Sequence, residues 1–344
     1  MLKPYINKVI NFENLTIEEA ESAMDIIMGG EATPSQVSAY IVALRMKGET
    51  IDEITGSVRG MRKASVKVHL KDRSQLVYDI VGTGGDGAHT FNISTASSFV
   101  LAGAGKKIAK HGNRAASSLS GSADVLSSLG LNMEMTPEQV GQAIDEINIG
   151  FMFAPKFHPA MRHAIGPRKE IGQRTIFNVL GPLTNPANAD VQLTGVYSSK
   201  LVQPIANVLR NLGSKGAMVL IGAGGTDELN TCGENQVCEL RGGELTEFRI
   251  NPAEYGLSPA NIQDLKGGTP DENADLMRKL LTGELKGPIR DSVLLNTGAA
   301  IAMESGNITD GIKQAAESID SGAAMAKMKH LVEFSRSFIQ EPLE

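Results

Sequence analysis

The chain of 344 residues has no tryptophan, two cysteines and few aromatic residues, which make up 4% of the sequence. Cys232 and Cys238 are too few for a disulfide framework, and their spacing does not match a metal site. No apolar run approaches the roughly 20 residues that span a bilayer. The N-terminal segment also lacks the apolar stretch of a signal peptide. We therefore expect a cytoplasmic protein that does not interact with a membrane.

The chain also has no excess of basic residues over acidic ones. The chain has 33 lysines and arginines against 39 aspartates and glutamates, which gives a formal net charge of -6 at pH 7. A surface that binds nucleic-acid phosphates needs charge of the opposite sign. The composition therefore argues against a nucleic-acid partner.

Residues 1–72 carry three signals for the start of a helix. Thr16 with Glu19, and Thr50 with Glu53, have the spacing of a capping box. A third start is marked by Thr33, which is followed by proline at the favoured first helical position. Apolar residues between these signals have helical spacing. The sequence therefore predicts a small helical domain over residues 1–72.

From about residue 75, short apolar runs alternate with helical patterns. The strand-like runs are LVYDIV, KKIAKHG, IGFMFAP, QLTGVYS and GAMVLIGAGG, and the last two flank the helical pattern KLVQPIANVLRNLG. This alternation predicts an α/β domain with a mostly parallel sheet over residues 73–344. The segment from NADLMRKLL onward is helical in pattern, with Gly283 and Gly287 as expected helix ends.

A glycine-rich segment, GTGGD over residues 82–86, follows the first strand-like run. Open α/β sheets bind ligands at the carboxyl ends of their strands, and glycine lets backbone N–H groups approach an anion. The segment matches neither the GxGxxG nor the GxxxxGK[ST] fingerprint, so a phosphate site and a plain glycine turn both stay open. Asp86 would repel a bare phosphate unless it bonds sugar hydroxyls or belongs to a metal-bridged site.

A second polar cluster is KHGNRAASSLSGSADVL, residues 110–126. Lysine, histidine, asparagine, arginine and four serines supply many hydrogen-bond donors with little apolar content. Such a set suits a polyphosphate better than a protein core. The alternative is an exposed polar loop that caps a helix.

Two adjacent carboxylates, Asp227 and Glu228, follow the apolar run GAMVLIGAGG. Neighbouring negative charges repel one another unless a cation lies between them. Mg²⁺ typically takes one or two carboxylates together with substrate phosphate oxygens, so these residues are candidate magnesium ligands. The alternative is a solvated loop, or a helix N-terminus that favours acidic residues.

Four basic residues, Arg162, Arg168, Lys169 and Arg174, crowd one segment of this acidic chain. An arginine can bind a substrate carboxylate through two parallel hydrogen bonds. We expect one of the four to be functional and the others to be solvated.

These motifs together resemble the anthranilate phosphoribosyltransferases, a family within the nucleoside-phosphorylase-like phosphoribosyltransferases. The resemblance covers nearly the whole chain, in the family's order, through GTGGDG, NISTASS, KHGNRAASS, SGSADVL, RTIFNVLGPLTNP, DEL, GGTPDENA and LLNTGAAI. KHGNRAASS and RTIFNVLGPLTNP are the most specific, whereas GTGGDG occurs in looser form in pyrimidine phosphorylases. Ile221 stands where the family commonly has histidine, and Thr226 where leucine is common.

The resemblance implies a phosphoribosyltransferase-like α/β fold with a mostly parallel central sheet. It also implies that a helical insertion at about residues 165–190 completes the helical domain, through which the protein forms a homodimer. The implied reaction transfers the phosphoribosyl group of 5-phosphoribosyl 1-pyrophosphate (PRPP) to the amine of anthranilate, in tryptophan biosynthesis. The implied cofactor is Mg²⁺, with two ions per subunit.

The family's roles fall on matching positions of this sequence. Ser94, Asp227 and Glu228 are the implied metal ligands, and Gly82, Asn113 and Arg168 would bind anthranilate, with Arg168 on its carboxylate. Lys110 and the metal-bound carboxylates would stabilise the transition state. No general base is singled out, and His111 is a candidate for proton handling. The implied PRPP-binding residues are Gly82, Gly85, Asp86, Thr90, Asn92, Ile93, Ser94, Thr95, Lys110, His111, Gly112, Asn113, Arg114, Ala115, Ala116, Ser117, Ser118 and Ser122.

Two rival functions stay open at this point. A pyrimidine nucleoside phosphorylase would carry a different serine-rich segment in place of KHGNRAAS and would need no Mg²⁺. A non-catalytic, nucleic-acid-binding relative would have a basic surface and would have lost the metal ligands. The acidic composition and the Asp227–Glu228 pair favour the transferase over both.

Overall fold

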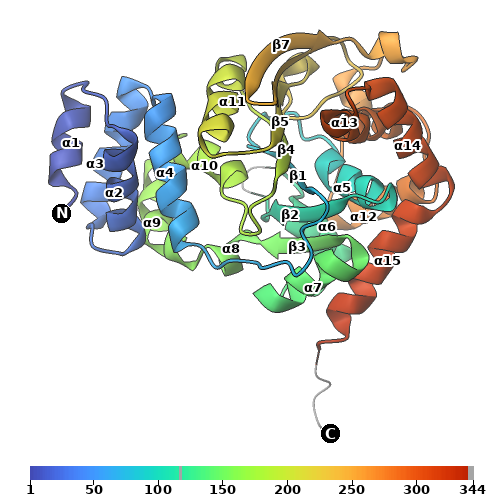
Figure 1. The fold of residues 1–344 in the computed structure, drawn as a ribbon, viewed down its shortest axis with the longest axis horizontal. Helices are drawn as coiled ribbons and strands as arrows, with labels where there is room; N and C mark the ends of the chain where they lie inside the picture. The colour runs from blue at the N-terminus through green and yellow to red at the C-terminus, as the bar shows by residue number, and fades with distance from the viewer. Residues whose placement is uncertain (116–117, 340–344) are drawn as a thin grey trace, which may run out of the picture.

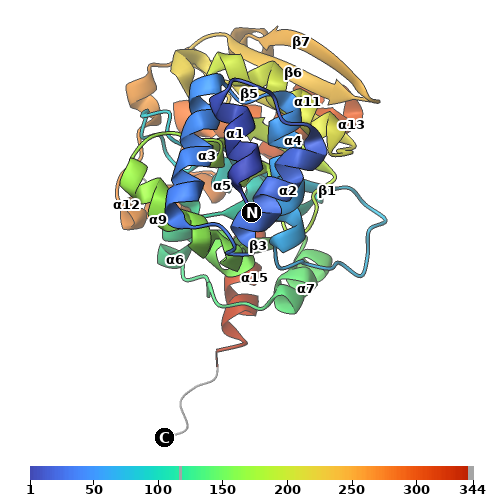
Figure 2. The ribbon, with the colours of Figure 1, turned by 90° about the vertical axis from the view of Figure 1, so that its left-hand side faces the viewer.

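A helical unit lies beside a larger α/β unit in the computed structural model, which describes residues 1–115 and 118–339 (Figures 1 and 2). The first helices are α1 (Lys3–Ile10), α2 (Ile17–Met28), α3 (Pro34–Lys47) and α4 (Ile51–Ala64). The three predicted start signals are confirmed as capping boxes. The hydroxyls of Thr16, Thr33 and Thr50 each accept the N–H three residues on, and the glutamate or glutamine there accepts the threonine N–H.

Helices α2 and α4 pack closely because α4 carries two glycines on the side that faces α2. A Cβ atom at Gly56 would overlap the Ile17 carbonyl oxygen, and one at Gly60 would lie 2.8 Å from the Met24 Cβ. Helix α9 (Arg162–Ile171) joins the bundle from much later in the chain by packing on α2 and α3.

A seven-stranded sheet forms the centre of the α/β unit, in the order β3-β2-β1-β4-β5-β6-β7. The strands β1 to β5 are parallel, whereas β6 and β7 pair antiparallel to their neighbours. Their bounds are Val77–Gly82, Lys107–Gly112, Ile149–Phe153, Val191–Gly195, Gly216–Ile221, Asn235–Arg241 and Glu244–Ile250. The predicted mostly parallel sheet is confirmed, and the β6–β7 hairpin, joined by the two-residue turn Gly242–Gly243, is an addition that we did not predict.

Two hydrophobic cores lie on opposite faces of this sheet. On β5, Met218 and Leu220 face one core and the alternating Ala217 and Val219 face the other, as the period of a strand requires. The second core is shared with α1–α4, α9, α10 (Phe177–Leu183) and α11 (Val202–Asn211). The helical unit therefore packs against α10 and α11 on one side of the sheet, and the boundary at residue 72 stays our proposal.

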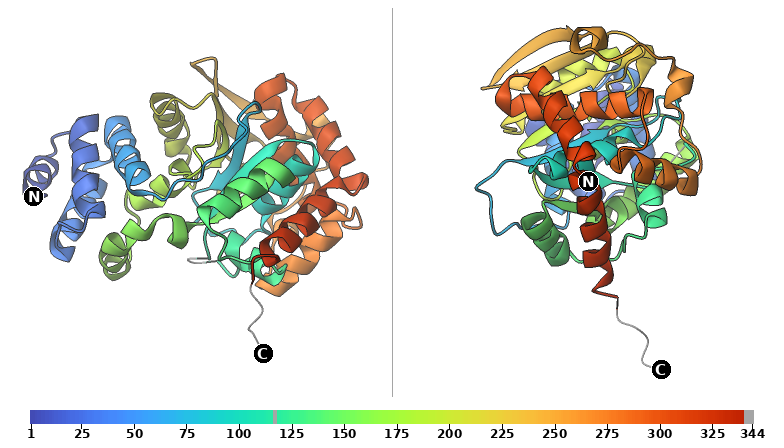
Figure 3. Two further views of the ribbon diagram at one scale, coloured as in Figure 1. Left: turned by 60° about the horizontal axis from the view of Figure 1, so that its bottom comes forward. Right: turned by 90° about the vertical axis from the view of Figure 1, so that its right-hand side faces the viewer.

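The other face of the sheet is covered by helices from two parts of the chain. Figure 3 shows the C-terminal helices, coloured orange to red, on the side of the sheet away from the helical unit. This layer contains α5 (Ile93–Gly103), α6 (Ser122–Ser128), α7 (Pro137–Ile147), α12 (Pro270–Leu281), α13 (Pro288–Ser305), α14 (Ile308–Asp320) and α15 (Ala323–Arg336), and the short α8 (Ala154–Phe157) follows β3. Among the residues described, no helix is both long and apolar enough to cross a membrane.

One predicted helix end is wrong. Gly283 does follow the end of α12, but Gly287 precedes a helix instead of ending one. It is the N-cap residue of α13, with φ of 86°, and Pro288 occupies the first helical position. Proline there fits a helix start, because the missing N–H has no partner in the first turn.

The close packing of α2 and α4 leads to a stability prediction. We expect Gly56→Ala to lower the melting temperature by several degrees, because overpacking typically costs about 1–3 kcal/mol. Gly166→Ala is the matched control, since Gly166 is also helical but has no atom within 4 Å of a built Cβ. The control should be neutral or slightly stabilising. Equal melting curves for the two variants would contradict this account of the packing.

Candidate active site

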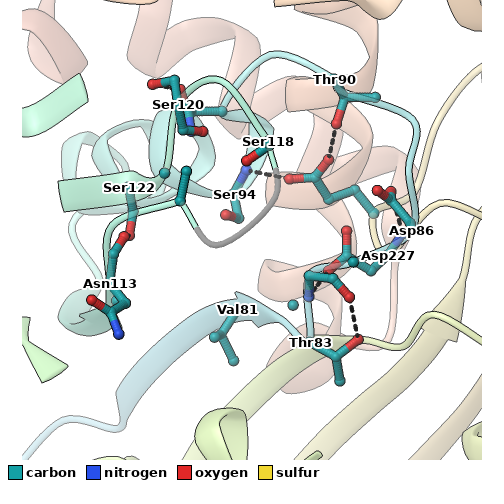
Figure 4. Close-up of a pocket in the computed structure, with 18 of the residues that line it drawn as sticks. Val81, Thr83, Asp86, Thr90, Ser94, Asn113, Ser118, Ser120, Ser122 and Asp227 are labelled. Carbon is teal, nitrogen blue, oxygen red and sulfur yellow. Dashed lines mark hydrogen bonds between the residues drawn. The ribbon is translucent and has the colours of Figure 1, made fainter. Parts of the chain in front are cut away.

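A cavity of about 650 Å³ opens at the carboxyl ends of the parallel strands (Figure 4). After β1, the chain adds β2 and β3 on one side, and then crosses to the other side of β1 to form β4. Ligands of open α/β sheets bind at such a switch point. The cavity is lined by the glycine loop, the start of α5, the end of β2 and the segment after it, residues 172–174 and 178, and the Asp227–Glu228 pair.

The loop that carries Asp227 and Glu228 crosses the ends of three strands, each of which lacks a side chain there. A Cβ at Gly195, at the end of β4, would overlap the Asp227 carbonyl oxygen. A Cβ at Gly82, at the end of β1, would overlap the Asp227 carboxylate, and one at Gly222 after β5 would overlap the Glu228 carbonyl oxygen. These glycines therefore make room for the two acidic residues.

The glycine loop itself serves a different purpose. Gly84 and Gly87 have φ of 67° and 77°, and no atom lies within 4 Å of a Cβ built on either. Positive φ is the conformation that glycine adopts without strain. The loop thus exposes backbone to the cavity, as the sequence predicted, whereas Gly82 is required by Asp227.

Each acidic side chain is held by hydrogen bonds from a different part of the cavity wall. Asp227 Oδ2 accepts the Gly84 N–H at 2.6 Å. Glu228 accepts the Thr90 hydroxyl and the Ser94 N–H, each at 3.1 Å. Figure 4 shows Thr90, Ser94 and Asp227 around the same part of the cavity. The pair therefore links the glycine loop to the start of α5.

Both carboxylates are costly to ionise in the protein without a cation. Burial, together with the charge of the nearby Asp86, raises the pKa of Asp227 to about 6. Burial, together with the charge of Asp227, raises the pKa of Glu228 to about 8. Buried, mutually repelling carboxylate oxygens beside a hydroxyl-bearing residue, Ser94, are a donor set that fits Mg²⁺.

Thr226, which stands where the family commonly has leucine, adds hydrogen bonds to this loop. The buried Thr226 hydroxyl donates to the Glu228 carbonyl oxygen at 2.9 Å and accepts from Asn230 Nδ2 at 2.7 Å. A leucine could make neither bond. Threonine in place of leucine therefore leaves the two carboxylates in position, and its hydrogen bonds hold the backbone from Thr226 to Glu228.

The opposite wall of the cavity carries cationic and amide groups from the end of β2. Lys110 is buried, and its ammonium group donates to the Ile80 carbonyl oxygen at 2.8 Å. Arg114 pairs with Asp124 at 2.9 Å, and the Ala115 N–H also donates to Asp124. Arg114 and Ala115 are thus tied to Asp124 in the first turn of α6.

His111 is a weak base in this setting. Its ring lies 5.0 Å from that of His158, and burial lowers the pKa of His111 to about 3. The imidazole is therefore neutral at pH 7. This argues against a role in which His111 gains and loses a proton readily.

Arg174 is a residue whose position the sequence did not indicate. Its guanidinium donates to the Gly85 carbonyl oxygen and lies 4.2 Å from the centre of the Tyr197 ring. The Tyr197 N–H in turn donates to the Thr83 hydroxyl at 3.1 Å. Arg174 was expected to be solvated, but it lines the cavity and holds the glycine loop from the side of α9 and α10.

The cavity brings together most of the residues that the sequence singled out. Arg168 is not among its lining residues; it lies on α9 with its guanidinium 5.3 Å from the centre of the Phe177 ring, and burial lowers its pKa. Ile93 is buried in α5, and Ala116 and Ser117 lie outside the described residues. The candidate residues that line the cavity are Gly82, Gly85, Asp86, Thr90, Asn92, Ser94, Thr95, Lys110, His111, Gly112, Asn113, Arg114, Ala115, Ser118, Ser122, Asp227 and Glu228.

Known families match both units of the chain. The glycosyl transferase family's α/β domain matches residues 74–325, and its helical bundle domain matches residues 3–65. An anthranilate phosphoribosyltransferase of Symbiobacterium thermophilum is 49% identical over 336 residues, which cover 97% of this chain and 98% of that protein. The chain belongs to the anthranilate phosphoribosyltransferases.

Solved structures of this family agree with the fold. The anthranilate phosphoribosyltransferase of Thermus thermophilus superposes with a TM-score of 0.92 at 44% identity, covering 96% of this chain and 99% of that one. The Saccharomyces cerevisiae enzyme, solved in complex with PRPP and Mg, gives a TM-score of 0.90 at 30% identity, covering 98% of both chains. The resemblance and the fold class read from the motifs are confirmed.

The buried Glu228 should make the stability of this anthranilate phosphoribosyltransferase depend on pH. Its pKa of about 8 in the folded chain exceeds the ~4.3 of an unfolded glutamate, so the folded state binds more protons between these values. Stability of the ligand-free protein should therefore fall as the pH rises through this window. We expect Glu228→Gln to raise its melting temperature at pH 8.5, by roughly 2 °C or more, and by less at pH 5.5.

The exposed Glu254 provides the control for this melting series. Glu254→Gln should leave the melting temperature close to that of the unaltered protein at both pH values. A melting temperature for Glu228→Gln that differs from the unaltered protein equally at both pH values would contradict the buried, proton-linked state of Glu228.

Proposed function

We propose that this chain transfers the phosphoribosyl group of PRPP to the amine of anthranilate within the cavity, giving N-(5-phosphoribosyl)anthranilate and pyrophosphate in tryptophan biosynthesis. One observation carries the proposal. Two buried carboxylates line the cavity together with Lys110, and Asn113 and Ser122 of the donor-rich segment after β2 line it across from Asp227 (Figure 4). This division suits a substrate that needs both a cation and direct phosphate contacts.

In the proposed reaction, the bond from ribose C1 to the pyrophosphate oxygen breaks, and its electron pair leaves with pyrophosphate. A bond from C1 to the anthranilate nitrogen forms, and that nitrogen releases one proton to solvent. Mg²⁺, held by Asp227, Glu228 and Ser94, would offset the charge of the leaving pyrophosphate. Lys110 contributes a fixed positive charge, and the glycine loop supplies backbone contacts. The aromatic amine is neutral at pH 7 and already nucleophilic, so holding it near C1 contributes more than a strong base would.

We further propose two Mg²⁺ ions per subunit. The two carboxylates turn to different parts of the wall, Asp227 to the glycine loop and Glu228 to the start of α5. Each can therefore serve as the protein ligand of a separate ion that PRPP oxygens complete. Equilibrium dialysis with Mn²⁺ and PRPP would count them, and one ion per subunit at saturation would contradict the proposal.

The direct test is an activity assay. Anthranilate fluorescence should fall when the protein is mixed with PRPP, anthranilate and Mg²⁺, and the fall should stop in excess chelator. Glu228→Gln should lose most of this activity, whereas the exposed Glu254→Gln should retain it. Equal rates with and without chelator would exclude the metal-dependent reaction, and no fluorescence change at all would exclude the transferase.

Arg168 is proposed to bind the anthranilate carboxylate from the helical side of the site. Because it does not line the cavity, this role requires α9 to approach the α/β unit when substrates bind. Loss of a charge-assisted pair typically costs on the order of 2–5 kcal/mol, so Arg168→Ala should raise KM for anthranilate at least tenfold. KM for PRPP should change little. The exposed Arg162→Ala on the same helix is the control, and equal effects on both substrates would make Arg168 a structural residue.

A homodimer through the helical units and a cytoplasmic location remain further proposals. Ile10, Phe12 and Met46 are exposed apolar residues of the helical unit, which supports a contact with a second copy. Sedimentation of Phe12→Asp should then show a smaller mass than the unaltered protein. An unaltered mass would move the interface elsewhere or leave the protein a monomer.

A further inference from the structure

The strands β1 and β2 separate at the end that faces the cavity. β1 pairs with β2 at Val77–Lys107 and Tyr78–Ile108, whereas its ladder with β4 continues to Gly82–Gly195. The same register, continued, would set Asp79 opposite Ala109 and Ile80 opposite Lys110. Backbone groups at these positions would be left without partners in the sheet interior, which proteins rarely tolerate.

Buried side chains take the place of the missing ladder bonds. The Asp79 carboxylate accepts the His111 N–H at 3.4 Å, and the Lys110 ammonium donates to the Ile80 carbonyl oxygen at 2.8 Å. Asp79 thus acts as the acceptor that a β1 carbonyl would supply. Lys110 acts as the donor that a β2 N–H would supply.

Asn185 fills the gap between the two strands. Its Nδ2 donates to Asp79 Oδ2 at 2.7 Å and to the Ala109 carbonyl oxygen at 2.8 Å, so that one amide group bridges β1 and β2. The Asn185 Oδ1 accepts the Ala187 N–H at 2.9 Å, which fixes the orientation of the amide. Asp79, Lys110 and Asn185 are all at most 3% exposed.

A buried carboxylate in a central strand is a poor choice for stability alone, because a well-packed apolar residue is often as good or better. Here the polar group lies beside the lysine that lines the cavity. Two acidic groups act on that lysine, Asp79 from β1 and Glu228 from the loop after β5, and the adjacent His111 is neutral.

We propose that Asp79 and Asn185 are positioning residues, which hold the end of β2 away from β1 and keep Lys110 cationic at the cavity wall. Neither is among the residues that line the cavity. Both act through Lys110 and the backbone of residues 109–111. The consequence for substrate binding rests on the function proposed above, whereas the consequence for the backbone does not.

The first measurement is the affinity for PRPP with Mg²⁺, by calorimetry, from pH 6.5 to 9. Asp79→Asn should weaken binding at least tenfold, and the loss should grow toward pH 9. The reason is that burial lowers the pKa of Lys110 and the Asp79 charge opposes this shift. Asn185→Ala should weaken binding without the added pH dependence, since it leaves the Asp79 carboxylate in place.

Two further variants separate positioning from a general loss of structure. The exchange of both side chains, Asp79→Asn with Asn185→Asp, returns a carboxylate to the network and should restore part of the affinity at pH 9. Asp190→Asn is the matched control: Asp190 accepts the Val77 N–H at the opposite end of β1 and pairs with Arg73 and Lys215. It should lower the melting temperature and leave PRPP affinity unchanged.

The second measurement is amide hydrogen exchange without any ligand. Asp79→Asn and Asn185→Ala should exchange faster at residues 109–112 than the unaltered protein, and Asp190→Asn should not. If the unaltered protein binds no PRPP, the proposed function fails and this measurement alone decides the inference. Unchanged exchange at residues 109–112, or a PRPP affinity that falls no further in Asp79→Asn than in Asp190→Asn, would overturn it.

Discussion

The crossing of one acidic loop over the ends of three parallel strands is the constraint on which the site depends. Side chains normally project from strand ends, and at Gly82, Gly195 and Gly222 a single Cβ would overlap atoms of Asp227 or Glu228. Because glycine has no Cβ, the loop lies directly on the sheet at these three positions, and the Gly84 N–H reaches the Asp227 carboxylate. Moving the loop outward by the width of a methyl group would break this bond. It would also break the two bonds that tie Glu228 to Thr90 and to Ser94 at the start of α5.

The strand β1 carries constraints on both of its edges. On the β4 side, the glycine that ends β1 admits Asp227. On the β2 side, Asp79 and its partners hold the neighbouring strand at a distance. The cavity therefore opens at the end of β1. There the Asp227 loop comes too close for a side chain on β1, and buried side chains keep β2 apart from β1. The glycines beneath the Asp227 loop fix the acidic wall of the site. Asp79 and Asn185, which do not line the cavity, fix the position of Lys110.

Local signals in the sequence predicted the local parts of this arrangement. The threonines that begin α2, α3 and α4 act through residues three positions away, so their effect can be read without the fold. The hairpin of β6 and β7 also has a local signal, the pair Gly242–Gly243 between two strand-like runs, but we did not predict it because the strands do not alternate regularly between apolar and polar residues. Arg174 and Asp79 acquire their roles from contacts with residues 89 and 106 positions distant in the chain, at Gly85 and Asn185. Spacing along the chain cannot show such contacts. One arginine among several basic residues, or one polar residue within an apolar run, therefore gives no indication of its role.

The electrostatics of the cavity favour joint binding of the cation and PRPP. Without ligands, burial and the neighbouring carboxylates make Asp227 and Glu228 costly to ionise, and their raised pKa values express that cost. A cation relieves the repulsion, yet two carboxylates and a serine leave most positions around Mg²⁺ to other oxygens. In the proposed complex, phosphate oxygens of PRPP would supply them, and Lys110 would attract the same substrate. Each ligand therefore removes a cost that the other would meet alone, so the site should hold the pair more firmly than either one.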